Sequence, residues 1–498
     1  MTLLSNAYRS GWIGLVSMSF FIVLVASWGT PAHANPERWA ELDNCELLTA
    51  GGRLSVEAMC GTLQVPENPA APDGQQLELA WAVMPALLGA VEPDPVVFLA
   101  GGPGQSAREM APIMASAFRN INRNRDLIFL DQRGTGGSNA LNCEFQGFDL
   151  LTEPDMQELN QQLRRCMDDN GALLEHYTTQ DGADDLELLR QHIGADQLNL
   201  VGGSYGTRMA QVYLRSYPEH VRSVVIDGVV PTRLKLGAEH ADKLDQSLEK
   251  LFAACQAQTE CNRQFPGLSD AFEQIKQRYA SEPIEIQVTH PRTGVAEPVL
   301  FNLETLAGSL RFLAYSPSSQ MMIPYLVHEA AATGNPERLA AQGLIQGEQL
   351  TEVIAIGLNF SVGCSEDWPH WPQGQDSSGT LMGNAMRDLY AEVCQWWPAD
   401  PVDTSFHTPF DSDAPVLVLS GEFDPVTPPE YGDEAAAQFS NSRHLVATGR
   451  GHIVTTNPCI SGIVNDFIAA GDLADLDTEC MATIGPEPFF LNLLGPSP

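Results

Sequence analysis

Short apolar segments of four or five residues recur along the chain, and helix-like segments lie between them. Residues 181–193 place Leu186, Leu189 and Ile193 on one helical face, and residues 207–217 form a second helix-like stretch that ends before Pro218. The apolar segments are Val96–Leu99, Asp126–Leu130, Leu198–Val201, Ser223–Ile226, Pro415–Leu419 and Arg443–Ala447. Short, continuously apolar strands that alternate with helices are typical of a parallel sheet covered on both faces. The sequence therefore predicts an α/β fold.

The alternation is interrupted once. Residues 236–404 are mostly helix-like and contain one strand-like run, Ile284–Val288, before the strand pattern returns at Pro415. We therefore expect a single α/β domain divided by a mainly helical cap. The predicted units are the first part of the core at 35–235, the cap at 236–404 and the C-terminal part of the core at 405–498. Within residues 35–95 the sequence indicates one strand, Leu77–Met84.

The N-terminal segment has the layout of a secretory signal peptide. Arg9 is the only charged residue before residue 37, an apolar run extends from about Trp12 to Ala26, and Ala32-His33-Ala34 is a small-residue cleavage signal. The alternative is a membrane anchor helix, but Gly29 and Pro31 continue a helix poorly. We predict that residues 1–34 are removed, that no stable membrane insertion follows, and that the protein is exported to a periplasm or secreted.

The charge balance restricts the partners. The 498 residues include 27 Lys and Arg against 63 Asp and Glu, a formal charge of −36, which becomes −37 once Arg9 is lost with the signal peptide. Nucleic acids and anionic membranes bind basic surfaces, so neither is expected as a partner. The sequence carries no information on the oligomeric state.

All ten cysteines follow the predicted cleavage site, and in an exported protein an even number indicates disulfides. They fall into five sequential couples. We predict the bridges Cys45–Cys60, Cys143–Cys166, Cys255–Cys261, Cys364–Cys394 and Cys459–Cys480. The alternative, a metal site, lacks any C-x-x-C or H-E-x-x-H spacing. We expect neither a metal nor another cofactor.

Gly202-Gly203-Ser204-Tyr205-Gly206 stands between a predicted strand and a predicted helix. This is the G-x-S-x-G pattern in the context of a nucleophile elbow, a sharp turn that exposes a strained serine. The glycines are needed because neighbouring side chains would collide in such a turn. Ser204 is therefore the predicted nucleophile.

A serine nucleophile needs a base, and the base needs an acid that orients it. Asp424 and His452 each follow a predicted strand, in the chain order Ser, acid, His that this fold uses. Asp227 and Glu422 are alternatives for the acid. His444 is an alternative for the base, but it lies within a predicted strand.

Two loops complete the predicted site. Gly101-Gly102-Pro103-Gly104 follows the strand Val96–Leu99, where bare backbone can approach a developing oxyanion. We predict the amides of Tyr205 and Gly102 as the oxyanion-hole donors; an ordinary Gly/Pro turn is the alternative. For Asp131-Gln132-Arg133-Gly134 we expect a buried Asp/Arg network that braces the site.

Together, GGPG, DQRGTGGS, GGSYGTRMAQVYLRSYPEHVRSVVIDGVVP and GEFDPVTPP…GRGH resemble exported tripeptidyl-aminopeptidase-like serine hydrolases. These are relatives of prolyl aminopeptidases within the α/β-hydrolase superfamily. The resemblance covers about residues 90 to 480, and Ala100 stands where prolyl aminopeptidases usually have His. It implies cleavage of short peptides from a free N-terminus through an acyl-enzyme on Ser204.

An aminopeptidase must bind a substrate ammonium, for which a cap carboxylate is the natural partner. Our candidates are Glu366 and, second, Asp367; the alternative is that they are ordinary acids of a disulfide-stapled cap. The triad does not separate a peptidase from a carboxylesterase or related acyl hydrolase, because both reactions share a tetrahedral intermediate. A non-catalytic binding protein on the same scaffold is a third hypothesis.

Overall fold

The computed structural model describes residues 38–89, 91–143 and 156–495. Its centre is a nine-stranded sheet of order β1-β2-β3-β5-β4-β6-β7-β10-β11. Strands β5, β4, β6, β7, β10 and β11 run parallel, whereas β1, β2 and β3 pair antiparallel. The strands are β1 (Asp43–Leu48), β2 (Ser55–Pro66), β3 (Gln76–Met84), β4 (Val96–Leu99), β5 (Leu127–Leu130), β6 (Leu198–Gly203), β7 (Val221–Asp227), β10 (Val416–Gly421) and β11 (Ser442–Ala447). The predicted α/β class and mostly parallel sheet are confirmed.

Helices cover both faces of the sheet because alternate residues of each apolar strand point to opposite sides. Val97 and Leu99 pack with α3 (Thr179–His192), α4 (Tyr205–Ser216) and α14 (Pro429–Gln438). Val96 and Phe98 pack on the other face with α1 (Ala107–Ala117) and α15 (Pro458–Ala470). The strands are thus buried on both sides, which explains their continuous apolar sequences.

Strands β1 and β2 have no counterpart in the sequence prediction, which placed a single strand in residues 35–95. Both lie at the antiparallel edge of the sheet, and most of their residues are exposed or half-buried. Edge strands that bury few side chains carry no apolar run, so hydrophobicity alone does not reveal them.

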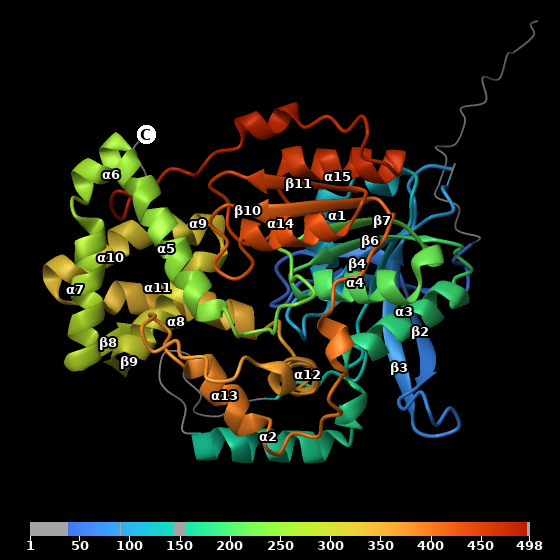
Figure 1. Ribbon diagram of the computed structural model, residues 1–498, viewed down its shortest axis with the longest axis horizontal. Coiled ribbons are helices and arrows are strands. Elements are labelled where there is room, and N and C mark those ends of the chain that lie inside the picture. Colours follow the sequence, from blue (N-terminus) through green and yellow to red (C-terminus); the bar gives the residue numbers. More distant parts are fainter. Residues whose placement is uncertain (1–37, 90, 144–155, 496–498) are drawn as a thin grey trace, which may run out of the picture.

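Residues 236–404, which we call the cap segment, are mainly helical. The elements are α5 (His240–Ala257), α6 (Thr259–Gln264), α7 (Leu268–Ser281), α8 (Leu303–Tyr315), α9 (Pro317–Gln320), α10 (Ile323–Thr333), α11 (Glu337–Thr351), α12 (Ile356–Val362) and α13 (Ala385–Val393), with a hairpin of β8 (Ile284–Thr289) and β9 (Ala296–Phe301). Helices α5 to α11 surround an apolar core of their own. They lie beyond the end of the sheet toward which β10 and β11 point (Figure 1).

The second half of the cap segment packs on a helix from the earlier part of the chain. Helix α2 (Met156–Asn170) shares a buried cluster with α12 and α13, and Trp396 Nε1 donates to Asn160 Oδ1 at 2.9 Å. In Figure 1, α2 lies along the lower edge of the molecule, beneath α13.

The ten cysteines pair in the five couples expected from their spacing, Cys45–Cys60, Cys143–Cys166, Cys255–Cys261, Cys364–Cys394 and Cys459–Cys480. The predicted signal peptide, residues 1–34, lies outside the described residues. Among the helices that are described, none combines the length and apolarity needed to span a membrane.

Candidate active site

Ser204 occupies the turn between β6 and α4 with φ 54° and ψ −124°, a backbone conformation that non-glycine residues rarely adopt. The flanking glycines are required by close backbone approach. A Cβ at Gly202 would lie 2.4 Å from the carbonyl oxygen of Gly206, and a Cβ at Gly206 would lie 2.1 Å from that of Leu99. The G-x-S-x-G pattern is therefore a steric consequence of packing this turn against β4.

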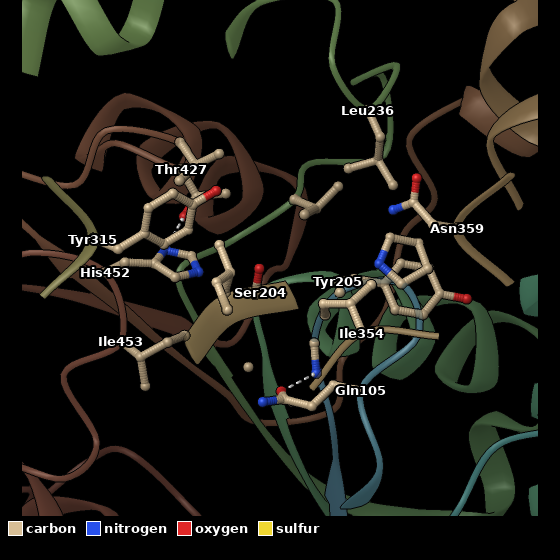
Figure 2. Close-up of a pocket in the computed structure, with 18 of the residues that line it drawn as sticks. Gln105, Ser204, Tyr205, Leu236, Tyr315, Ile354, Asn359, Thr427, His452 and Ile453 are labelled. Atoms are coloured by element: carbon tan, nitrogen blue, oxygen red, sulfur yellow. Dashed lines mark hydrogen bonds between the residues drawn. The ribbon is translucent and has the colours of Figure 1, made fainter. Parts of the chain in front are cut away.

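Asp424 follows β10, His452 follows β11, and the two side chains meet beside Ser204. His452 Nδ1 lies 2.7 Å from Asp424 Oδ2. Asp424 Oδ1 accepts hydrogen bonds from the amides of Val426 and Thr427 at 2.9 and 2.8 Å, which holds the carboxylate in one orientation. Figure 2 shows His452 and Ser204 facing the same space.

Thr427 is a site residue that the sequence analysis missed. Its Oγ1 donates to Asp424 Oδ2 at 2.8 Å and lies 3.1 Å from His452 Nδ1 (Figure 2). A threonine three residues after an aspartate in a turn is the local signal that could have identified it, because such side chains readily bond within the turn.

The electrostatics of the pair suit base catalysis. Burial raises the pKa of Asp424, but His452 and the backbone donors lower it more, so the net pKa lies below its ordinary value. Burial lowers the pKa of His452, but the Asp424 carboxylate raises it more, so the net pKa lies above its ordinary value. An ionised Asp424 fixes the Nδ1–H tautomer and leaves Nε2 able to accept a proton from Ser204.

The alternative acids and the alternative base have other partners. Asp227 Oδ2 accepts from the amides of Val454 and Thr455 and from the Thr455 hydroxyl, at 2.6–2.8 Å, and so anchors the segment after His452. Glu422 Oε2 accepts from the Gly449 amide at 2.7 Å. His444 lies between Asp433 Oδ1 and Ser420 Oγ, at 2.8 and 2.9 Å.

The predicted oxyanion-hole residues lie beside Ser204. Gly102 has φ 108°, a conformation open mainly to glycine. Gly101 N donates to Gln105 Oε1 at 3.2 Å, the contact drawn as a dashed line at Gln105 in Figure 2. Among the described residues, no acceptor is paired with the amides of Gly102 and Tyr205. Both residues line the cavity that Ser204 faces.

The Asp131-Gln132-Arg133 segment forms separate contacts rather than one Asp/Arg network. Asp131 accepts from Ser106 Oγ at 2.6 Å and thereby holds the start of α1 behind the glycine loop. Arg133 makes a two-pronged ion pair with Asp185 at 2.7 Å. Gln132 Nε2 donates to the Tyr205 hydroxyl at 3.2 Å and is the direct link to the site.

Glu366 and Asp367, predicted to bind the substrate amine, lie behind the cavity wall rather than on it. Both are 0% exposed, and both are ion-paired with Arg208, at 3.2 and 3.0 Å. Glu366 also accepts from the Thr179 amide and hydroxyl, and that hydroxyl contacts the Tyr205 hydroxyl at 2.8 Å. Burial raises the pKa of Glu366 to about 7, against the lowering effect of Arg208.

The structure thus brings Ser204, Asp424, His452, Tyr205 and Gly102 together and leaves Glu366 and Asp367 one layer away. The common cavity has a volume of about 450 Å³, within the range of small-molecule sites. Its floor comes from the strand ends, and its other walls include residues of α8, α12 and α13 of the cap segment, together with residues of α1, α5 and α11. The described residues contain no group of three or more His, Cys, Asp or Glu placed to hold a metal ion.

Comparison with known families agrees with this geometry. The family model described as alpha/beta hydrolase fold matches residues 94–455, and the chain belongs to that family. With a serine at the elbow and the relatives described next, it is a serine hydrolase.

The chain is similar over most of its length to three named proteins. It is 25% identical to the tripeptidyl aminopeptidase of Streptomyces coelicolor, covering 88% of this chain and 86% of the relative. It is 24% identical to the serine protease Hip1 of Mycobacterium tuberculosis, covering 91% and 93%. It is also 25% identical to a carboxylesterase B of Mycobacterium tuberculosis, covering 91% of each.

Proposed function

We propose that this chain is an exported serine peptidase that removes short peptides or single residues from the free N-termini of peptides. The observation that carries the proposal is the cavity at Ser204, because residues of the cap segment form the part of its lining that lies opposite the strand ends. A cavity walled in this way admits a chain end more readily than the middle of a chain. The names of two relatives, a tripeptidyl aminopeptidase and a serine protease, support the same class.

In the proposed mechanism Ser204 Oγ attacks the scissile carbonyl while His452 Nε2 takes its proton. The amides of Tyr205 and Gly102 stabilise the oxyanion, and Asp424 stabilises the imidazolium. His452 returns the proton to the leaving amine, which releases the C-terminal fragment. Water, deprotonated by His452, then attacks the acyl-enzyme and releases the N-terminal fragment.

We further propose the domain division and the export route that the sequence indicates. The two core parts, 35–235 and 405–498, supply the catalytic residues, and the cap at 236–404 supplies the substrate-facing walls. Five disulfides fit an oxidising compartment, and the predicted signal peptide at 1–34 would direct the chain to such a compartment.

The alternative is a carboxylesterase or related acyl hydrolase that uses the same triad. One observation favours it: among the described lining residues the only carboxylate is Asp227, whose Oδ2 already accepts three hydrogen bonds. An ammonium group would therefore have one carboxylate oxygen of the lining, the buried Asp227 Oδ1, which has no hydrogen-bond partner among the described residues, and otherwise neutral acceptors.

The test compares peptides with free and N-acetylated N-termini and an ester of the same acyl group. An aminopeptidase loses most of its kcat/KM on acetylation, whereas an acyl hydrolase retains it and prefers the ester. A fluorophosphonate probe should label the wild-type protein and not Ser204→Ala. Absence of labelling in folded wild type would refute both hydrolase functions.

A further inference from the structure

The cavity over Ser204 contains one cationic side chain that the proposed mechanism does not use. Arg311, on α8, is the only Arg or Lys among the described residues that line the cavity. It lies one helical turn before Tyr315, whose ring packs edge-on against His452 with centroids 5.5 Å apart. Residues four apart share a helix face, with about 5–6 Å between Cβ atoms, so Arg311 is close to the catalytic end of the cavity.

No carboxylate in the described part of the chain is ion-paired with Arg311. Its Nη1 donates to Met386 Sδ at 3.4 Å, and a thioether sulfur is a weak acceptor. The chain has 63 acidic residues against 27 Lys and Arg, so carboxylates that could pair with an arginine are abundant. The guanidinium is half-buried in the cavity wall and has no counter-ion among the described residues, so its donors could serve an anionic group.

Two neighbours supply further hydrogen-bonding capacity. His240, at the start of α5, has a buried Nδ1 with no partner in the described residues. Burial and the nearby Arg311 lower the pKa of His240 to about 3, so the ring is neutral at physiological pH. Asn359 accepts from the Tyr390 hydroxyl at 3.0 Å, which leaves its amide nitrogen available, and Figure 2 shows it across the cavity from His452.

We infer that Arg311 binds a carboxylate of the substrate and thereby sets specificity. The guanidinium offers the forked geometry that suits a carboxylate, with Asn359 and His240 as neutral neighbours. The carboxylate is either the C-terminus of a short peptide or an Asp or Glu side chain close to the cleaved bond. The inference deepens the proposed function and rests on it for the peptide nature of the substrate.

The experiment uses two matched substrate pairs. The first is one short, otherwise neutral peptide with either a free C-terminal carboxylate or a C-terminal amide. The second is a peptide amide with either Glu or Gln next to the cleaved bond. The wild-type enzyme should prefer the carboxylate member of at least one pair by about 10- to 100-fold in kcat/KM, the effect of a charged hydrogen bond. The pair that shows the preference identifies the source.

The variants are Arg311→Met, Arg311→Lys and, as a control, Arg263→Met, which removes an exposed arginine of the same cap segment. Arg311→Met should bring the ratio within each pair close to one, and Arg311→Lys should give an intermediate ratio because it keeps the charge and loses the fork. Arg263→Met should retain the wild-type ratio. Fluorophosphonate labelling of Ser204 verifies that each variant is folded.

Equal rates within both pairs in the wild-type enzyme would overturn the inference, as would a preference that survives in Arg311→Met. Failure of the proposed function has a different signature. N-acetylated peptides would then be cleaved at the same rate as peptides with a free N-terminus, whatever the ratio within the carboxylate pairs.

Discussion

At the scale of single residues, Thr427 holds Asp424, the proposed acid of the triad, in place. Replacing Thr427 by Val removes the hydroxyl that donates to Asp424 Oδ2 and keeps the shape of the side chain. We expect kcat to fall by about tenfold with little change in KM, the value of one hydrogen bond to a charged group. Steady-state kinetics on a neutral ester would measure it. Thr427→Ser is the matched control, and a loss of equal size there would exclude the hydroxyl as the cause.

In the proposed mechanism the pH dependence of the reaction is set by His452. Only the neutral imidazole can accept the Ser204 proton, so kcat/KM should rise with pH, with a midpoint above the ordinary histidine value because Asp424 raises the net pKa of His452. In Asp424→Asn the raising charge is gone, so the midpoint should move to lower pH while kcat falls by about 10⁴-fold. A midpoint that stays in place would assign the wild-type pH dependence to another group.

A substitution at Glu366 can show whether this buried carboxylate binds the substrate or instead positions residues of the candidate active site. Glu366 contacts Thr179, and Thr179 contacts the hydroxyl of Tyr205, whose amide is a proposed oxyanion donor. Glu366→Gln should therefore reduce kcat similarly for a free-amine peptide and for an ester, by about tenfold. A rise in KM restricted to the free-amine peptide would instead assign the ammonium to Glu366.

At the scale of structural elements, the Cys364–Cys394 bridge ties the turn that carries Glu366 to the end of α13. It spans 30 residues of sequence, whereas Cys255–Cys261 spans 6. Loop entropy predicts that removing both cysteines of the first pair lowers the free energy of unfolding by about 3–4 kcal/mol, against about 2 kcal/mol for the second. Urea titration of the two double-Ala variants measures the difference. The reverse order would show that strain or local packing outweighs loop length.

At the scale of the whole molecule, the charge of −36 acts on approaching substrates. A negative field attracts cationic peptides and repels anionic ones, and salt screens both effects. Between about 0.01 and 0.5 M salt, kcat/KM should fall several-fold for a peptide amide with a free N-terminus and stay nearly constant for its acetylated form. Stopped assays across this range would measure the slopes. Parallel slopes would show that salt acts on the enzyme and not on the encounter.

The candidate catalytic residues could be proposed from the sequence because the constraints on each of them are local. Ser204 needs glycines where a Cβ would strike backbone, and Asp424 and His452 stand at the ends of strands that are apolar because both faces are buried. Sequential cysteine couples likewise indicated the disulfide pairs. These features are visible in a single sequence because each depends on residues close in the sequence, at most 30 positions apart for the cysteine couples.

Other features depended on the tertiary structure, because they arise between segments far apart in the chain. Strands β1 and β2 pair at an exposed edge that leaves no apolar run. In the sequence Glu366 cannot be told from an exposed glutamate, but in the structure it is buried and bound to Arg208 and Thr179. In the sequence Arg311 cannot be told from any other helical arginine. Its place in the cavity lining depends on how α8 packs against the loop that carries His452. The sequence by itself determined the fold class, the disulfide pairs and the candidate catalytic residues, because short-range patterns carry them, and the packing of the cap decided which side chains line the cavity.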